Sequence, residues 1–179
     1  MRIKDHIFSW DLEPLSRSER FLHLSEAYLE SSLHLFEALE NGSLRRTFSH
    51  ALVADFLFEH SVELFLKGAV FRARGQITPT HKLDDLYNEF RNLYPGKKFH
   101  FLAKIQDIVT PDPDRPYSQF ARYPVDSEGK PWGGGNVHFH LGLWLEQLRQ
   151  FREDYERLRP LLESKYPSDS SLEQPAPPP

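Results

Sequence analysis

The sequence predicts an all-α fold, an antiparallel bundle of about five helices with a long Pro/Gly-rich loop or hairpin before the last helix. Two observations support this: long segments repeat apolar residues at helical spacing, and capping residues and glycines separate these segments. A third is that residues 110–136 have no period and are rich in Pro, Gly and Asp. We expect an arm over 1–15, one bundle over 16–165 and a disordered Pro-rich tail over 166–179.

The first helix is expected to begin at Ser16, because Ser16 and Glu19 have the spacing of a capping box. Asn41 and Gly42 supply a left-handed C-cap where it ends. A second helix is expected over residues 44–74 and stops at a glycine.

The third helix is expected to open with Thr78 as its cap and Pro79 as its first helical residue, and to end before the sequence YPG. A fourth helix is expected over 97–109, where a Pro-rich stretch follows. The fifth is expected over about 136–165, with apolar residues at helical spacing. These are Leu141, Trp144, Leu145, Leu148, Phe151, Tyr155, Leu158 and Leu162.

Composition excludes several classes of protein. The chain has no cysteine, which rules out disulfides and thiol chemistry and fits the cytoplasm. It has no apolar run of about 18 residues, so we expect no membrane span. A formal net charge of −4 argues against a large basic surface that binds nucleic acid. The sequence predicts neither a cofactor nor a metal site.

Polar residues interrupt the second helix along one edge, which covers about 140° of its circumference at 100° per residue. They are Asp55, Glu59, His60, Glu63, Lys67 and Arg74. One interpretation is a solvated edge, with Glu63 and Lys67 paired and Lys67 extending outward. The other is an anion site, formed by Lys67, Arg74 and His81 at the expected start of the third helix.

The stretch ALVADFLFEHSVELFLKGAVFRARGQITPTHKLDDLYNEF, residues 51–90, resembles the HEPN family, and FARYPVD, residues 120–126, resembles an element before that family's last long helix. The resemblance implies a helical bundle that usually forms dimers. Its members include ribonucleases of toxin–antitoxin and defence systems, proposed nucleotide-binding domains and partners of nucleotidyltransferases.

Catalytic members of that family carry an Arg and a His four to six residues apart near the start of the last core helix. Here that place holds Arg122 and Tyr123, and no histidine lies in range. Arg122 and Tyr123 are therefore candidates for ligand binding. Arg122, or Arg74 with His81, are the candidates for catalysis.

The resulting expectation is a homodimeric module that binds a nucleotide or RNA and lacks a recognisable active site. A metal-independent ribonuclease of toxin–antitoxin or defence type is one alternative, and an accessory subunit that binds a nucleotidyltransferase or antitoxin partner is another. The dimer is also expected because the first and fifth helices carry apolar residues beyond a single stripe, with Leu22, Leu33 and Phe36 on the first.

Overall fold

The computed structural model describes residues 12–96 and 140–166. These residues form four helices and no strand: α1 (Arg17–Asn41), α2 (Phe48–Arg74), α3 (Leu83–Leu93) and α6 (Leu141–Lys165). The all-α prediction is confirmed for these ranges. The fourth predicted helix and the Pro/Gly-rich loop lie outside the described residues, as do the N-terminal arm up to residue 11 and the tail from 167 onward.

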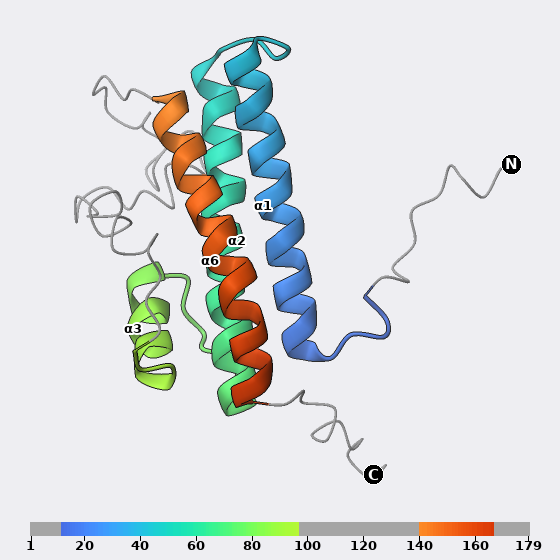
Figure 1. Ribbon diagram of the computed structural model, residues 1–179, viewed down its shortest axis with the longest axis vertical. Coiled ribbons are helices and arrows are strands. Elements are labelled where there is room, and N and C mark those ends of the chain that lie inside the picture. The colour runs from blue at the N-terminus through green and yellow to red at the C-terminus, as the bar shows by residue number, and fades with distance from the viewer. Residues whose placement is uncertain (1–11, 97–139, 167–179) are drawn as a thin grey trace, which may run out of the picture.

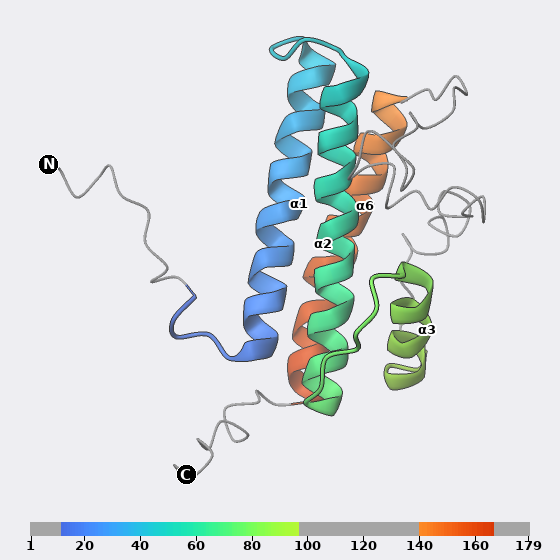
Figure 2. The same cartoon turned by 180° about the vertical axis from the view of Figure 1, so that it is seen from behind.

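The three long helices lie side by side, and α3 lies beside the C-terminal half of α2 (Figures 1 and 2). α1 runs antiparallel to α2, while α6 runs in the same direction as α2. α2 packs against each of the other three helices. This central position explains why its residues 61–66 are all buried. None of the described helices is both long and apolar enough to cross a membrane.

The helix ends show which local signals are correct. Ser16 and Glu19 form the predicted capping box, and Gly42 and Gly75 end α1 and α2 in the left-handed conformation. α2 begins later than predicted, at Phe48. The Thr47 hydroxyl caps it by accepting a hydrogen bond from the His50 backbone N–H.

The predicted start of the third helix is wrong. Thr78 and Pro79 precede α3, which begins at Leu83, because hydrogen bonds within residues 78–82 hold this segment out of the helix. The Thr80 backbone N–H donates to the Thr78 carbonyl, and the Thr80 hydroxyl accepts from the Lys82 backbone N–H. α6 also begins later than predicted: His140 is its cap, and the ring Nδ1 accepts from the Leu143 backbone N–H.

The core is formed by aromatic and aliphatic side chains from all four helices. Phe65 of α2 is fully buried, and its ring lies 5.1–6.5 Å from the rings of Phe90, Phe151 and Tyr155. The buried residues of the α6 stripe are Leu145, Leu148, Phe151, Tyr155, Leu158 and Leu162, as its helical spacing predicts. Trp144 and Leu141 pack against the edge of the core.

α1 and α2 meet along a line of small residues that we call the serine seam: Ser25, Ser32, Ala54, Ser61 and Gly68. The Ser25 hydroxyl donates to the Ser61 carbonyl (2.8 Å), and the Ser61 hydroxyl donates to the Ser25 carbonyl (2.7 Å). Gly68 lets the backbones approach so closely that a Cβ atom there would lie 3.0 Å from the Cβ of Phe21. The seam fixes the position of α2 against α1.

Three apolar residues of α1 that were expected at a dimer interface lie in the core instead. Leu22, Leu33 and Phe36 are buried inside the single chain, at 0%, 5% and 0% exposure. They belong to the core formed with α2 and α6, so they provide no apolar surface for a second copy. The first helix therefore gives no support to a dimer, which remains a prediction from the fifth helix and the family resemblance.

Candidate functional site

The polar edge of α2 is partly a buried ionic cluster. Asp55 and Glu63 are 0% and 3% exposed, so the interpretation of a solvated edge is wrong for both residues. We define the Glu63 cluster as Glu63, His60, Lys67 and His81. His60, Glu63 and Lys67 share one side of α2 because they are three and four residues apart. His81 comes from the segment that joins α2 to α3.

The Glu63 carboxylate accepts two short hydrogen bonds. Its Oε1 lies 2.8 Å from Lys67 Nζ and 2.8 Å from His81 Nδ1. The predicted pairing of Glu63 with Lys67 is therefore confirmed. His60 Nδ1 lies 3.6 Å from the other oxygen, Oε2, which is longer than a hydrogen bond.

The carboxylate remains ionised at every ordinary pH. Burial of Glu63 by itself raises the pKa of its carboxyl, but contacts with His60, Lys67 and His81 outweigh burial and lower this pKa from 4.5 to about 2. An ionised carboxylate only accepts hydrogen bonds, so Nδ1 of His81 must be the donor. This leaves Nε2 as the second ring nitrogen, on a side chain that is 69% exposed.

Two groups of this cluster have hydrogen-bonding capacity left over. Lys67 Nζ carries three N–H donors, and within the described ranges only the one to Glu63 has an acceptor. The Lys67 side chain is 10% exposed, so only a small part of it is reachable from solvent. His81 Nε2 makes no hydrogen bond with any described residue. Lys67 and His81 can therefore contact one further group from solvent, with the Glu63 carboxylate between them.

Arg74 does not join this cluster. It pairs with Glu89 of α3, whose other carboxylate oxygen accepts a 2.6 Å hydrogen bond from the Thr78 hydroxyl. Arg74 also lies seven residues beyond Lys67, about 10 Å further along the helix axis. The structure thus brings together two of the three residues predicted for the anion site. The helix start expected to complete that site is absent, because α3 begins at Leu83.

The other predicted site residues, Arg122 and Tyr123, lie outside the described residues. Sequence reasoning included Glu63 only as a helical partner of Lys67 and missed that it also holds His81. It missed Glu89 as the partner of Arg74, since 15 residues and a change of helix separate them. Only the i,i+4 spacing of Glu63 and Lys67 gave a usable signal.

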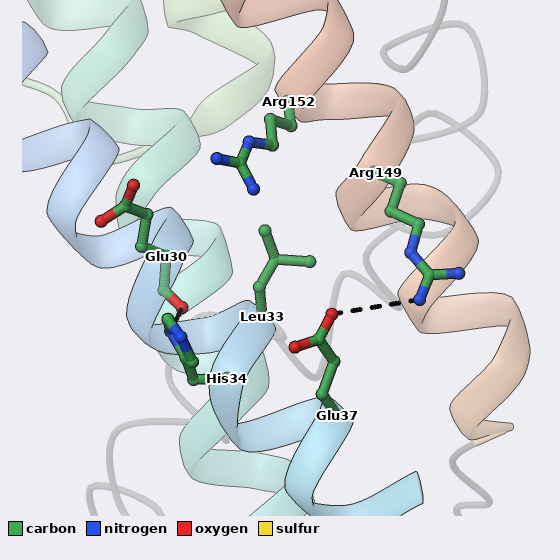
Figure 3. Close-up of a pocket in the computed structure, with 6 residues that line it drawn as sticks. All are labelled: Glu30, Leu33, His34, Glu37, Arg149 and Arg152. Atoms are coloured by element: carbon green, nitrogen blue, oxygen red, sulfur yellow. Dashed lines mark hydrogen bonds and ion pairs between the residues drawn. The ribbon is translucent and has the colours of Figure 1, made fainter.

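A second polar site is a pocket of about 360 Å³ between α1 and α6 (Figure 3). Its charged residues balance: Arg149 lies 4.0 Å from Glu37, and Arg152 lies 3.4 Å from Glu156 outside the pocket. The His34 ring donates from Nδ1 to the Glu30 backbone carbonyl. With two arginines and two glutamates in its lining, the pocket offers no excess charge to an ionic ligand.

Over residues 12–96 and 140–166, no group of three or more His, Asp or Glu side chains is arranged to hold a metal ion. Comparison of the chain with protein-family models, curated proteins and solved structures gives no match. The resemblance to the HEPN family therefore depends only on the sequence motifs, and the site must be interpreted from its own geometry.

Proposed function

We propose that this protein is a HEPN-like module that binds the phosphate of a nucleotide or of RNA at Lys67 and His81. The observation that carries the proposal is the spare hydrogen-bonding capacity of these two side chains, which one carboxylate holds side by side. Charge-assisted hydrogen bonds from an ammonium and an imidazolium suit phosphate oxygens. Arg122 and Tyr123 are further candidates for contacts with such a ligand.

The Glu63 carboxylate limits the strength of this site. It neutralises one positive charge, so a phosphate meets a net cation only when a histidine of the cluster is protonated. We therefore expect weak binding that decreases with salt, as phosphate contacts generally do. A tight, salt-independent complex would contradict this mechanism.

The test is to titrate the full chain with inorganic phosphate, a nucleoside monophosphate or mixed-sequence RNA and to measure its melting temperature at each ligand concentration. A ligand that binds the folded state raises the melting temperature by mass action. Lys67→Met and His81→Asn are each expected to remove this rise. Lys82→Gln is the matched control, because it deletes a positive charge on an exposed residue beside His81 and should keep the rise. Equal responses of all three variants would contradict the proposed site.

One observation favours the ribonuclease alternative, namely the hydrogen bond that orients His81. Because Glu63 fixes the proton on Nδ1, the neutral ring presents Nε2 as a base, an arrangement used in general base catalysis. Nε2 could take the proton of an RNA 2′-hydroxyl while that oxygen attacks phosphorus, and Lys67 could stabilise the phosphate charge. The 5′-oxygen of the next nucleotide would leave, giving a 2′,3′-cyclic phosphate.

Incubation of the chain with RNA in the presence of a chelator separates the two functions. The binding module leaves the RNA intact. Cleavage that His81→Asn abolishes, and that Lys82→Gln retains, would establish the ribonuclease instead. Glu63→Gln should then also slow cleavage, since the amide no longer fixes the tautomer of His81.

A further inference from the structure

A second pocket, of about 420 Å³, lies on the surface formed by α1, α2 and the segment after α2. Among the described residues its lining is almost wholly apolar and consists of Phe21, Leu24, Leu64, Phe71 and Ile77, together with the polar residues Arg17 and Arg20. We call this the apolar pocket. Its volume falls within the range of small-molecule sites in proteins, which also combine apolar walls with a few polar groups.

The pocket has a fixed floor and an exposed rim. Leu64 and Phe71 are 8% and 6% exposed, and the Phe21 and Phe71 rings lie 6.2 Å apart, so the floor belongs to the packed α1–α2 pair. Leu24 and Ile77 on the rim are 37% and 54% exposed. An apolar ligand would therefore remove exposed hydrocarbon from water and would not need to displace core residues.

The two arginines have no carboxylate partner within the described ranges. Arg20 donates from Nε to the Leu15 carbonyl and from Nη2 to the Glu13 carbonyl. These bonds hold its guanidinium beside the turn that leads into α1. Arg17 makes no hydrogen bond or ion pair with any described residue. By contrast, Arg159 on α6 pairs with Glu26 at 2.9 Å. Positive charge at the edge of the apolar pocket is thus left for an external anion.

We infer that the apolar pocket binds a free amphiphilic carboxylate of the fatty-acid class. Its hydrocarbon chain lies against Phe21, Leu64 and Phe71 and under Ile77, and its carboxylate meets the Arg17 guanidinium. A planar guanidinium pairs well with a carboxylate, because two N–H groups can donate to the two oxygens. A nucleobase suits this lining less well, since only the arginines could bond with its polar edge.

The test is a calorimetric titration of the full chain with decanoate, kept below the concentration at which micelles form. Saturable binding with one site per chain is expected. Decanol, which has the same chain length but no charge, and acetate, which has the charge but no chain, should each bind at least tenfold more weakly. If decanol binds as well as decanoate, or if decanoate does not saturate one site, the inference is overturned.

Two substitutions with matched controls locate the site. Arg17→Gln should weaken decanoate binding about tenfold, because it removes a charge-assisted hydrogen bond. Arg45→Gln, which changes an exposed arginine at the other end of α1 and α2, should not change binding. Ile77→Ser should also weaken binding, whereas Val53→Ser, at a residue with 53% exposure compared with 54% for Ile77, should not. Equal effects of test and control variants would overturn the inference.

Light scattering in the same titration tests another occupant, a second copy of this chain. If decanoate converts a dimer into monomers, and Ile77→Ser alone gives the same monomer, the apolar pocket is a subunit interface and the inference is wrong. Because Lys67 and His81 do not line the apolar pocket, Lys67→Met should keep decanoate binding. Failure of this inference can thus be told apart from failure of the proposed phosphate site.

Discussion

The serine seam and the Glu63 cluster lie on different sides of α2, and both place polar groups in buried positions. Along the seam, each hydroxyl of Ser25, Ser32 and Ser61 donates to a carbonyl of the facing helix. In the Glu63 cluster, Lys67 and His81 both use the same carboxylate oxygen and keep unused capacity. The hydroxyls of the seam serve packing, whereas we propose that the cluster binds another molecule.

The difference also lies in the kind of group that is buried. A neutral hydroxyl bonded to a carbonyl contributes about 1 kcal/mol, and its loss leaves that carbonyl with its bond inside the helix. A buried ion pair contributes little in net terms, yet removal of one partner leaves a charge away from water. Substitutions in the two regions should therefore change stability by different mechanisms.

The largest effect is expected for Glu63→Leu, which leaves the Lys67 ammonium without its buried counterion. The free energy of unfolding should fall by about 3 kcal/mol. The double variant Glu63→Leu/Lys67→Met should recover at least half of this loss, since the ion pair is then replaced by apolar side chains. Urea unfolding measures both. If the double variant loses as much free energy of unfolding as the two single variants together, Glu63 and Lys67 do not stabilise the fold as a pair.

Acid should weaken the protein through the same carboxylate. The pKa of Glu63 is about 2 in the folded protein and 4.5 as a free group. Its contribution to stability is thus fully present above pH 4.5 and is lost as pH falls toward 2. The shift corresponds to about 3–4 kcal/mol, at about 1.4 kcal/mol per pH unit. Unfolding curves between pH 6 and pH 2 measure this loss, which Glu63→Gln should largely remove.

Features of the fold were predictable from the sequence when the interacting residues are close along the chain. Ser16 and Gly42 were predictable as caps because their partners lie within a few residues. The start of α3 was missed because the Thr78 hydroxyl donates to Glu89 of α3 and does not cap a helix, while the Thr80 hydroxyl accepts from the Lys82 backbone N–H. Local sequence propensity does not decide between two possible helix starts that lie only a few residues apart.

The same limit applies to the site. The bond of Lys67 to Glu63 follows from helical spacing, but the bond of His81 to Glu63 joins residues 18 apart. It depends on the path of the segment between α2 and α3, which no period in the sequence describes. Burial of Asp55 and Glu63 was missed for a related reason: α2 packs on more sides than an edge of polar residues indicates.

In the seam, Gly68→Ala should reduce the free energy of unfolding by about 1–2 kcal/mol. The new Cβ would lie 3.0 Å from Phe21 Cβ and 3.1 Å from Leu22 Cδ2, and that crowding outweighs the better helix propensity of alanine. Gly142→Ala in α6 is the control, because the nearest atom there is 3.8 Å away, and it should not destabilise. Phosphate should still raise the melting temperature of Gly68→Ala. Loss of that response would mean that the two sides of α2 are coupled.

The smallest effect is expected for Arg74→Gln, which tests where the Glu63 cluster ends. Arg74 is half exposed and pairs with Glu89, and surface ion pairs of this kind contribute about 0.5 kcal/mol. The hydrogen bond from Thr78 still holds Glu89 after the change. We therefore expect a barely altered urea midpoint and an unchanged response to inorganic phosphate. If Arg74→Gln removes the phosphate response as fully as Lys67→Met does, Arg74 must leave Glu89 when the ligand binds. The three-residue anion site inferred from the sequence would then be right, and the geometry of the unliganded chain would be only its resting arrangement.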